Sequence, residues 1–182
     1  MKNHQFNIFF SWQSDIKENR SIINNAIKTA CRKLKDNEGY SINIDDATRD
    51  RPGSPVIESS VKSKIDSCDI FIADITPITN HNNKLFPNSN VMFELGYAMR
   101  CMEIDRIIII SKDDNFNDKD FPFDINHHRI CKFSNGKINL DNKIKSSIEF
   151  VLNNGKFRYS RLFNDSHLKQ NISVGKYLPE VF

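Results

Sequence analysis

The sequence predicts an α/β fold in which helices cover both faces of a mainly parallel sheet. Short apolar, β-prone runs alternate along the chain with amphipathic segments of helical spacing. The longest aliphatic run, residues 107–110, has the length of a buried strand and is far too short to span a membrane. With 182 residues, 38% of them hydrophobic, the chain is long enough for one domain with a substantial core.

The first part of the chain has the pattern strand, helix, strand, helix. Residues 6–11 are apolar and β-prone, and residues 18–34 carry apolar side chains at helical spacing. Residues 40–44 form a second short strand, and a polar loop is expected at residues 45–52. Residues 54–66 again have helical spacing, with Val56, Ile57, Val61 and Ile65 directed inward.

The clearest strand is residues 69–74, an apolar run that ends in an aspartate. A long Asn-rich loop is expected at residues 76–89, followed by a helix over residues 90–102. The pattern then repeats, with two further strands and a last helix at residues 106–111, 129–133 and 138–152.

Strands that alternate with helices need crossover connections, which favour parallel pairing. We therefore expect a flavodoxin-like sheet of about five strands over residues 1–153. Loops at the carboxyl ends of such strands form the ligand crevice, so the segments after Ser11, Ile44 and Asp74 are expected to converge there. Residues 154–182 lose the periodicity and form a basic, aromatic extension that is expected to be a contact arm.

Composition limits the classes of function. The net charge is +3 and the basic residues are dispersed, so a nucleic-acid surface has weak support. The four cysteines form no C-x-x-C pair, and no apolar signal segment begins the chain, so a reduced, cytoplasmic setting is expected. His127 and His128 have no partner at a recognisable ligand spacing, so no metal is expected.

The first loop of the expected crevice contains Ser11, Trp12 and Asp15. Backbone amides at the following helix start suit a diphosphate, and the Trp12 ring suits stacking on a base. The alternative is that Ser14 or Asp15 only caps the helix. Both roles stay open, because capping and ligand contact can coexist.

Two further loops carry charged candidates. Arg49 and Arg51 stand beside a helix start, where guanidinium groups suit phosphate oxygens; the alternative is a solvated turn with internal ion pairs. Asp74 ends a buried strand, and we expect its carboxylate to face the crevice because an unpaired buried charge is costly.

The sharpest candidate is Glu94. Val91, Leu95, Ala98 and Met102 form one apolar helix face, and Glu94 lies on its flank in the expected first turn. Near a helix N-terminus its carboxylate should stay ionised, able to hold ribose hydroxyls or stabilise the cationic carbon formed as a glycosidic bond breaks. The alternative is an ordinary helix-favouring glutamate.

Three segments resemble TIR (Toll/interleukin-1 receptor) domains, especially the bacterial nucleotide-hydrolysing branch used in antiviral defence. Residues 7–15 resemble the first TIR strand and loop. Residues 49–53 resemble the TIR loop that contains Arg-Asp and Pro-Gly. Residues 65–74 resemble the helix end and the strand that follow this loop. Residues 90–96 are similar to the helix that bears the catalytic glutamate of the family.

This resemblance implies a flavodoxin-like fold and cleavage of the nicotinamide–ribose bond of NAD, by hydrolysis or by cyclisation. Glu94 would be the catalytic residue, and Asn90 and Tyr97 of the same segment join the expected substrate contacts. NAD would be the substrate rather than a cofactor. The resemblance also implies a homo-oligomer on activation, and a partner defence protein.

Two other functions remain open. Nucleoside 2-deoxyribosyltransferases have a similar aspartate-ended strand and a similar Asn, Glu-Leu-Gly-Tyr-Ala segment, here Asp74 and residues 90–98. In such an enzyme Glu94 would be a nucleophile that holds the sugar covalently. The third interpretation is a non-catalytic TIR adaptor or nucleotide-sensing module that works through protein contacts.

Overall fold

The computed structural model describes six segments of the chain, with gaps between them. Apart from the last residues of the final helix, all of them belong to one compact unit that runs to Val151. The expected boundary between residues 1–153 and 154–182 stays a prediction, because nearly all of the extension lies outside the described residues. The described segments are residues 5–38, 40–46, 54–82, 84–113, 116–134 and 139–154.

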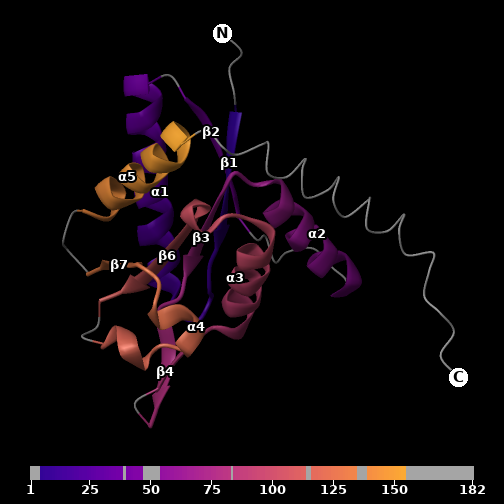
Figure 1. The fold of residues 1–182 in the computed structure, drawn as a ribbon, viewed down its shortest axis with the longest axis vertical. Coiled ribbons are helices and arrows are strands. Elements are labelled where there is room, and N and C mark those ends of the chain that lie inside the picture. Colours follow the sequence, from indigo (N-terminus) through magenta and orange to yellow (C-terminus); the bar gives the residue numbers. More distant parts are fainter. Residues whose placement is uncertain are drawn as a thin grey trace, which may run out of the picture. The chain divides into compact units, whose positions relative to one another are not determined.

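The central sheet has five parallel strands in the order β2-β1-β3-β6-β7 (Figure 1). Because β6 and β7 are the fourth and fifth strands of this sheet in the chain, the order is the flavodoxin-like one. The predicted fold class is therefore confirmed. The strand bounds are β1 Gln5–Ser11, β2 Ser41–Asp46, β3 Ile70–Asp74, β6 Ile107–Lys112 and β7 Ile130–Phe133.

Helices cover both faces of the sheet (Figure 1). The helices α1 and α5 lie together on one face, where Lys33 Nζ and Asp141 Oδ2 are 2.6 Å apart. The helices α2 and α3 lie on the other face, where the Tyr97 hydroxyl donates to Asp66. The bounds are α1 Lys17–Glu38, α2 Ser54–Ser67, α3 Ser89–Cys101 and α5 Leu140–Asn154.

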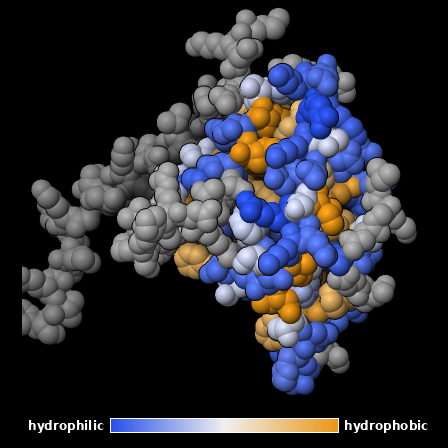
Figure 2. Space-filling model, turned by 180° about the vertical axis from the view of Figure 1, so that it is seen from behind, coloured by the Kyte–Doolittle hydropathy of each residue, from blue (hydrophilic) through white to orange (hydrophobic). Residues whose placement is uncertain are grey.

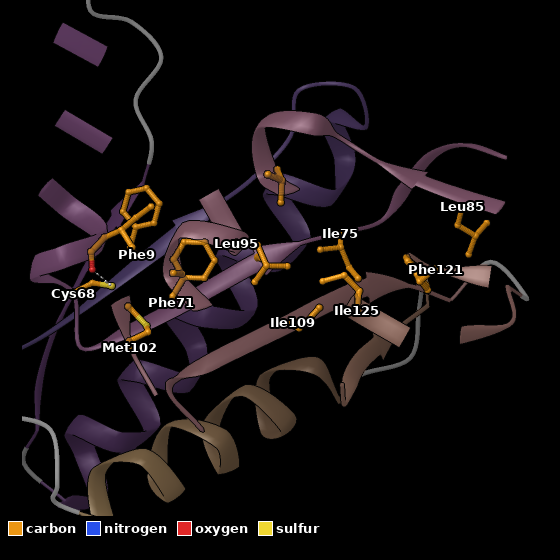
Figure 3. Packing of buried hydrophobic residues seen from close by; sticks show 14 residues of the cluster. Phe9, Cys68, Phe71, Ile75, Leu85, Leu95, Met102, Ile109, Phe121 and Ile125 are labelled. Carbon is orange, nitrogen blue, oxygen red and sulfur yellow. Dashed lines mark hydrogen bonds between the residues drawn. The ribbon is translucent and has the colours of Figure 1, made fainter. Parts of the chain in front are cut away.

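A hydrophobic cluster fills the space between the sheet and the face of α2 and α3 (Figure 3). Alternate strand residues contribute to it, as expected when side chains of a strand point to opposite faces. Phe9 and Phe71, on neighbouring strands, stack with ring centroids 5.8 Å apart. On α3 the inward positions are Val91, Leu95 and Ala98, as their spacing predicts.

The segment predicted as a long Asn-rich loop is instead a β-hairpin. The strands β4 (Pro77–His81) and β5 (Lys84–Pro87) pair antiparallel, and Asn82 at the turn has φ of 51°. Asparagine tolerates this backbone conformation, which two-residue hairpin turns require. Leu85 is 1% exposed and lies at the end of the hydrophobic cluster near Phe121, so the hairpin is anchored to the core (Figure 3).

The acidic segment between β6 and β7 contains two short helices and is fixed to the core. These helices are η2 (Asp118–Asp120) and α4 (Phe123–Asn126). Phe121 and Ile125 are each 3% exposed and belong to the hydrophobic cluster. The aspartates are thus carried on a segment that two apolar side chains fix to the core.

On the side shown in Figure 2, apolar surface occurs in small areas separated by hydrophilic side chains. The exposed large hydrophobic side chains are spread over different elements, including η1 (Ile104–Arg106). None of the helices in the described segments is long and apolar enough to cross a membrane. The exposed set is Ile22, Ile78, Phe86, Phe93, Ile104, Phe123 and Phe150.

Candidate active site

The candidate site lies at the carboxyl edge of the sheet, where β1 and β3 end. Ser11 is the last residue of β1, and it is fully buried. Its hydroxyl donates a hydrogen bond of 2.5 Å to Oε2 of Glu94 on α3. Two residues far apart in the sequence are therefore joined at the place where ligands bind in open parallel sheets.

Glu94 is half-buried and is the sixth residue of α3, which begins at Ser89. The prediction that it lies in the first turn is wrong, because one turn takes about 3.6 residues and Glu94 lies five residues after the helix start. The electrostatic effect of a helix N-terminus falls off within the first turn, so it contributes less here than expected. The Ser11 hydroxyl provides stabilisation instead, since a hydrogen bond to a carboxylate stabilises the negative charge of that carboxylate and fixes its orientation.

Asn88 connects the start of α3 to the loop after β1. As the N-cap residue, its Oδ1 accepts from the backbone N–H groups of Asn90 and Val91 at 2.9 and 3.3 Å. Its Nδ2 donates to Oδ2 of Asp15 at 2.6 Å. Asp15, expected as a substrate contact or a cap of α1, is thus bound to the cap of another helix.

Asn88 was not among the predicted site residues, although its signal was present in the sequence. An asparagine that follows Pro87 and precedes an apolar-periodic segment is a typical N-cap. Asn90, the expected substrate contact in this turn, has an exposed side chain, and its backbone N–H is used by the cap.

Asp74 does not face an open crevice, contrary to expectation. It is 0% exposed, and its Oδ1 accepts from the backbone N–H and the hydroxyl of Thr76 at 3.0 and 2.6 Å. Asn19 donates to both Oδ2 of Asp74 and Oγ1 of Thr76. Burial raises the pKa of the Asp74 carboxyl, and the hydrogen bonds from Thr76 and Asn19 oppose that rise.

Asp74 can be fully buried because hydrogen bonds from neighbouring polar groups replace those that water would make. The Thr76 hydroxyl also accepts from the backbone N–H of Lys112, so the network joins the ends of β3 and β6. Gln13, in the loop after β1, donates to the backbone oxygen of Thr76 at 2.8 Å. A buried carboxylate with such partners does not need to reach water.

Trp12 lies next to Ser11 and is half-buried. The guanidinium carbon of Arg20, on α1, lies 3.8 Å from the centroid of the Trp12 ring. One face of the ring predicted to stack on a base is therefore covered by an arginine that the sequence analysis did not single out. Its signal, an arginine in the first turn of the helix after the loop, was too common to be informative.

The remaining predicted residues do not join this group. The Tyr97 hydroxyl donates to Asp66, with both carboxylate oxygens at 3.1 Å, so it is directed toward α2. Arg49 and Arg51 lie outside the described residues. Their predicted phosphate contacts therefore stay predictions.

A carboxylate oriented by a buried hydroxyl at a sheet edge has two chemical uses. It can stabilise a carbon that becomes cationic as a bond to it breaks, or it can attack that carbon as a nucleophile. Among the described residues, no group of three or more His, Cys, Asp or Glu side chains is placed to hold a metal ion. His127 instead packs edge-on against Phe123, with ring centroids 4.9 Å apart.

No family model matches the chain. A comparison with curated proteins found no match either. Among solved structures, the 2-desoxiribosyltransferase from Leishmania mexicana is similar at 21% identity and a TM-score of 0.43, over 59% of this chain and 65% of that chain. The CMP N-glycosidase BcmB from Clostridium botulinum is similar at 13% identity and a TM-score of 0.44, over 79% of this chain and 98% of that chain.

The first of these matches spans just under two thirds of the transferase chain. Both TM-scores are below 0.5, so the fold assignment depends on the strand order of the chain itself and on no transferred property.

Proposed function

We propose that this protein is an enzyme that breaks the N-glycosidic bond of a nucleotide, with Glu94 as the catalytic residue and NAD as the substrate. The observation that carries the proposal is the hydrogen bond of 2.5 Å from the buried Ser11 hydroxyl to Glu94. It gives a half-buried carboxylate one fixed orientation at the sheet edge where nucleotides bind in this class of fold. An ordinary surface glutamate would need no such partner.

The charge of the substrate decides which bond a single carboxylate can break. The nicotinamide of NAD carries a positive charge, and it leaves as a neutral ring that takes the bonding electron pair. The ribose carbon becomes cationic, and the Glu94 carboxylate stabilises that charge. Water then adds in hydrolysis, or a nitrogen of the adenine adds in cyclisation.

This route needs no proton donor for the leaving group, and the surroundings of Glu94 favour it for that reason. Of the carboxylates that end β3 or follow β1, Asp74 is fully buried and Asp15 accepts from Asn88. Asp74 is therefore not accessible as an acid, and one carboxylate oxygen of the exposed Asp15 is already bound to Asn88. We therefore favour NAD over substrates whose leaving group is a neutral base.

A second candidate function is the transfer of a 2-deoxyribosyl group between bases, with Glu94 as the nucleophile. A neutral base leaves more easily when it is protonated, which calls for an acid near the sugar. Burial raises the pKa of Asp74, which favours a protonated carboxyl at the end of β3. This alternative requires the shell of Asn19 and Thr76 around Asp74 to open.

The resemblance to TIR domains adds self-assembly and bacterial antiviral defence to the proposal. A neighbouring copy would complete the site on activation, and a partner defence protein would deliver the signal. The corresponding experiment uses concentrated protein with and without a molecular crowder, so that assembly is varied directly.

The test is incubation with NAD and chromatographic separation of nicotinamide, ADP-ribose and cyclic products. Glu94→Gln is compared with Glu103→Gln, the same change at an exposed glutamate beyond α3. The proposal expects nicotinamide release by the wild type and by Glu103→Gln, and its loss in Glu94→Gln. Base exchange between deoxynucleosides, with a sugar adduct trapped on Glu94, would establish the transferase instead. If the assembled protein turns over neither substrate, the interpretation as a non-catalytic adaptor is favoured.

A further inference from the structure

The stacked pair Arg20 and Trp12 has no role in the chemistry described above. We propose that Arg20, held in place by the Trp12 ring, binds a phosphate group of the nucleotide at the carboxyl edge of the sheet. This inference rests on the proposed function, because it takes the ligand to be a nucleotide. It makes Arg20 a residue that distinguishes nucleotides from nucleosides.

The position of Arg20 on α1 places it at this edge. Ile23 and Ile27, three and seven residues further on, lie on the same side of the helix and are fully buried against the sheet. Arg20 therefore continues the inward side of α1 towards its N-terminal end. The preceding residue, Asn19, donates to Asp74 and Thr76, which end β3 and begin the next connection.

Trp12 links Arg20 to the candidate catalytic residue. It directly follows Ser11, whose hydroxyl donates to Glu94. The loop that carries Trp12 is fixed to the start of α3 by the hydrogen bond between Asn88 and Asp15. The guanidinium carbon of Arg20 is 3.8 Å from the ring centroid, within the range of a cation–π contact. The stacked guanidinium therefore lies on the α1 side of the edge at which Ser11 ends β1.

The chemistry of a stacked guanidinium suits an oxyanion. The group is planar, and stacking on a ring holds that plane while its N–H donors point along the plane rather than into the ring. The helix dipole does not stabilise a cation in the first turn of a helix. An anion bound there is attracted by the helix dipole and by the guanidinium group. Both side chains are half-buried, which strengthens the attraction relative to a fully solvated pair.

The experiment uses Trp12, the single tryptophan of the chain, as its reporter. Pyrophosphate is titrated into the full-length protein while the Trp12 fluorescence is recorded, and the affinity is confirmed by calorimetry. We expect a saturable change in the wild type. Arg20→Gln should weaken pyrophosphate binding about tenfold or more, the usual effect of losing a charged hydrogen bond.

Two variants control the result. Arg32→Gln removes the same charge from an exposed position further along α1 and should bind as the wild type does. Arg20→Lys keeps the charge but not the planar fork, and should bind with intermediate affinity. Circular dichroism verifies that each variant is folded. Unchanged pyrophosphate affinity in both Arg20 variants, or no saturable binding by the wild type, would overturn the inference.

The outcome is separate from that of the proposed function. If pyrophosphate binding depends on Arg20 but neither NAD nor deoxynucleosides are turned over, the phosphate site is supported and the proposed enzymatic function is rejected. If turnover depends on Glu94 but pyrophosphate binding does not depend on Arg20, the enzymatic function is supported and the phosphate site is rejected.

Discussion

The hydroxyl of Ser11 donates to Oε2 of Glu94, so the last residue of β1 orients a carboxylate that α3 carries. Ser11→Ala should reduce the turnover of NAD by about ten- to a hundredfold, since a hydrogen bond to a charged group contributes roughly 1.5–3 kcal/mol. The measurement is the rate of nicotinamide release. Ser111→Ala, at a buried serine in β6, is the control, and equal losses in both variants would point to general destabilisation.

The second prediction concerns the bond between Asn88 and Asp15. Asn88→Asp keeps a capping oxygen but sets two carboxylates against each other, whereas adding Asp15→Asn exchanges donor and acceptor and restores the pair. Denaturant unfolding should show that Asn88→Asp lowers the free energy of unfolding by about 1 kcal/mol or more, and that the double variant recovers most of it. Additive losses in the double variant would contradict the role of this bond.

The third prediction is a pH dependence of stability at Asp74. Its pKa in the folded protein is raised above the ordinary value of 3.8, so the unfolded chain loses this proton first as pH rises. The carboxyl therefore favours the folded state most at low pH, and that contribution falls as pH rises from about 3.8 through the raised pKa.

Asp74→Asn removes this titration but keeps an oxygen that can accept from Thr76. The stability of Asp74→Asn relative to the wild type should increase with pH across that interval, as measured by urea unfolding at a series of pH values. Asp74→Ala leaves the Thr76 donors without their acceptor and should be less stable than Asp74→Asn at every pH. A difference between Asp74→Asn and wild type that does not change with pH would reject this account.

The fourth prediction separates the two sides of the hairpin. Leu85→Ala should lower the free energy of unfolding by roughly 2–5 kcal/mol, because Leu85 is 1% exposed within the hydrophobic cluster. Phe86→Ala, the next residue but 44% exposed, should change it by much less. Thermal or denaturant unfolding of both variants makes the comparison. Equal effects would show that the hairpin is not anchored through Leu85.

The regular part of the fold could be predicted from sequence because periodicity reports burial directly. Residues 69–74 were predicted as a strand and all of β3 is buried, and the spacing of Val91, Leu95 and Ala98 gave the inward face of α3. The hairpin was missed because its asparagines and histidine are typical of a loop, while Leu85 is the one buried residue of its two strands that is not a proline. Two buried positions in a strand of four residues leave too little pattern to recognise.

The candidate site was predictable only in part, for a different reason. Ser11 and Glu94 were each singled out, but the sequence does not show that they touch. The burial of Asp74 was not foreseen because it depends on Asn19, Thr76 and Gln13, which come from three different parts of the chain. Polar groups on separate elements become a network only after the sheet has assembled, and periodicity carries no signal of such contacts.

The separation between Ser11 and Glu94 also has a consequence for biosynthesis. The two residues are 83 positions apart in the chain. During translation, β1, β2 and β3 are all made before the helix that bears the carboxylate, so the emerging protein holds the serine long before its partner exists. Closing such a long-range contact also costs loop entropy, which slows folding. The proposed cleavage of a glycosidic bond would thereby be absent on the ribosome and would begin only once the whole domain has been made.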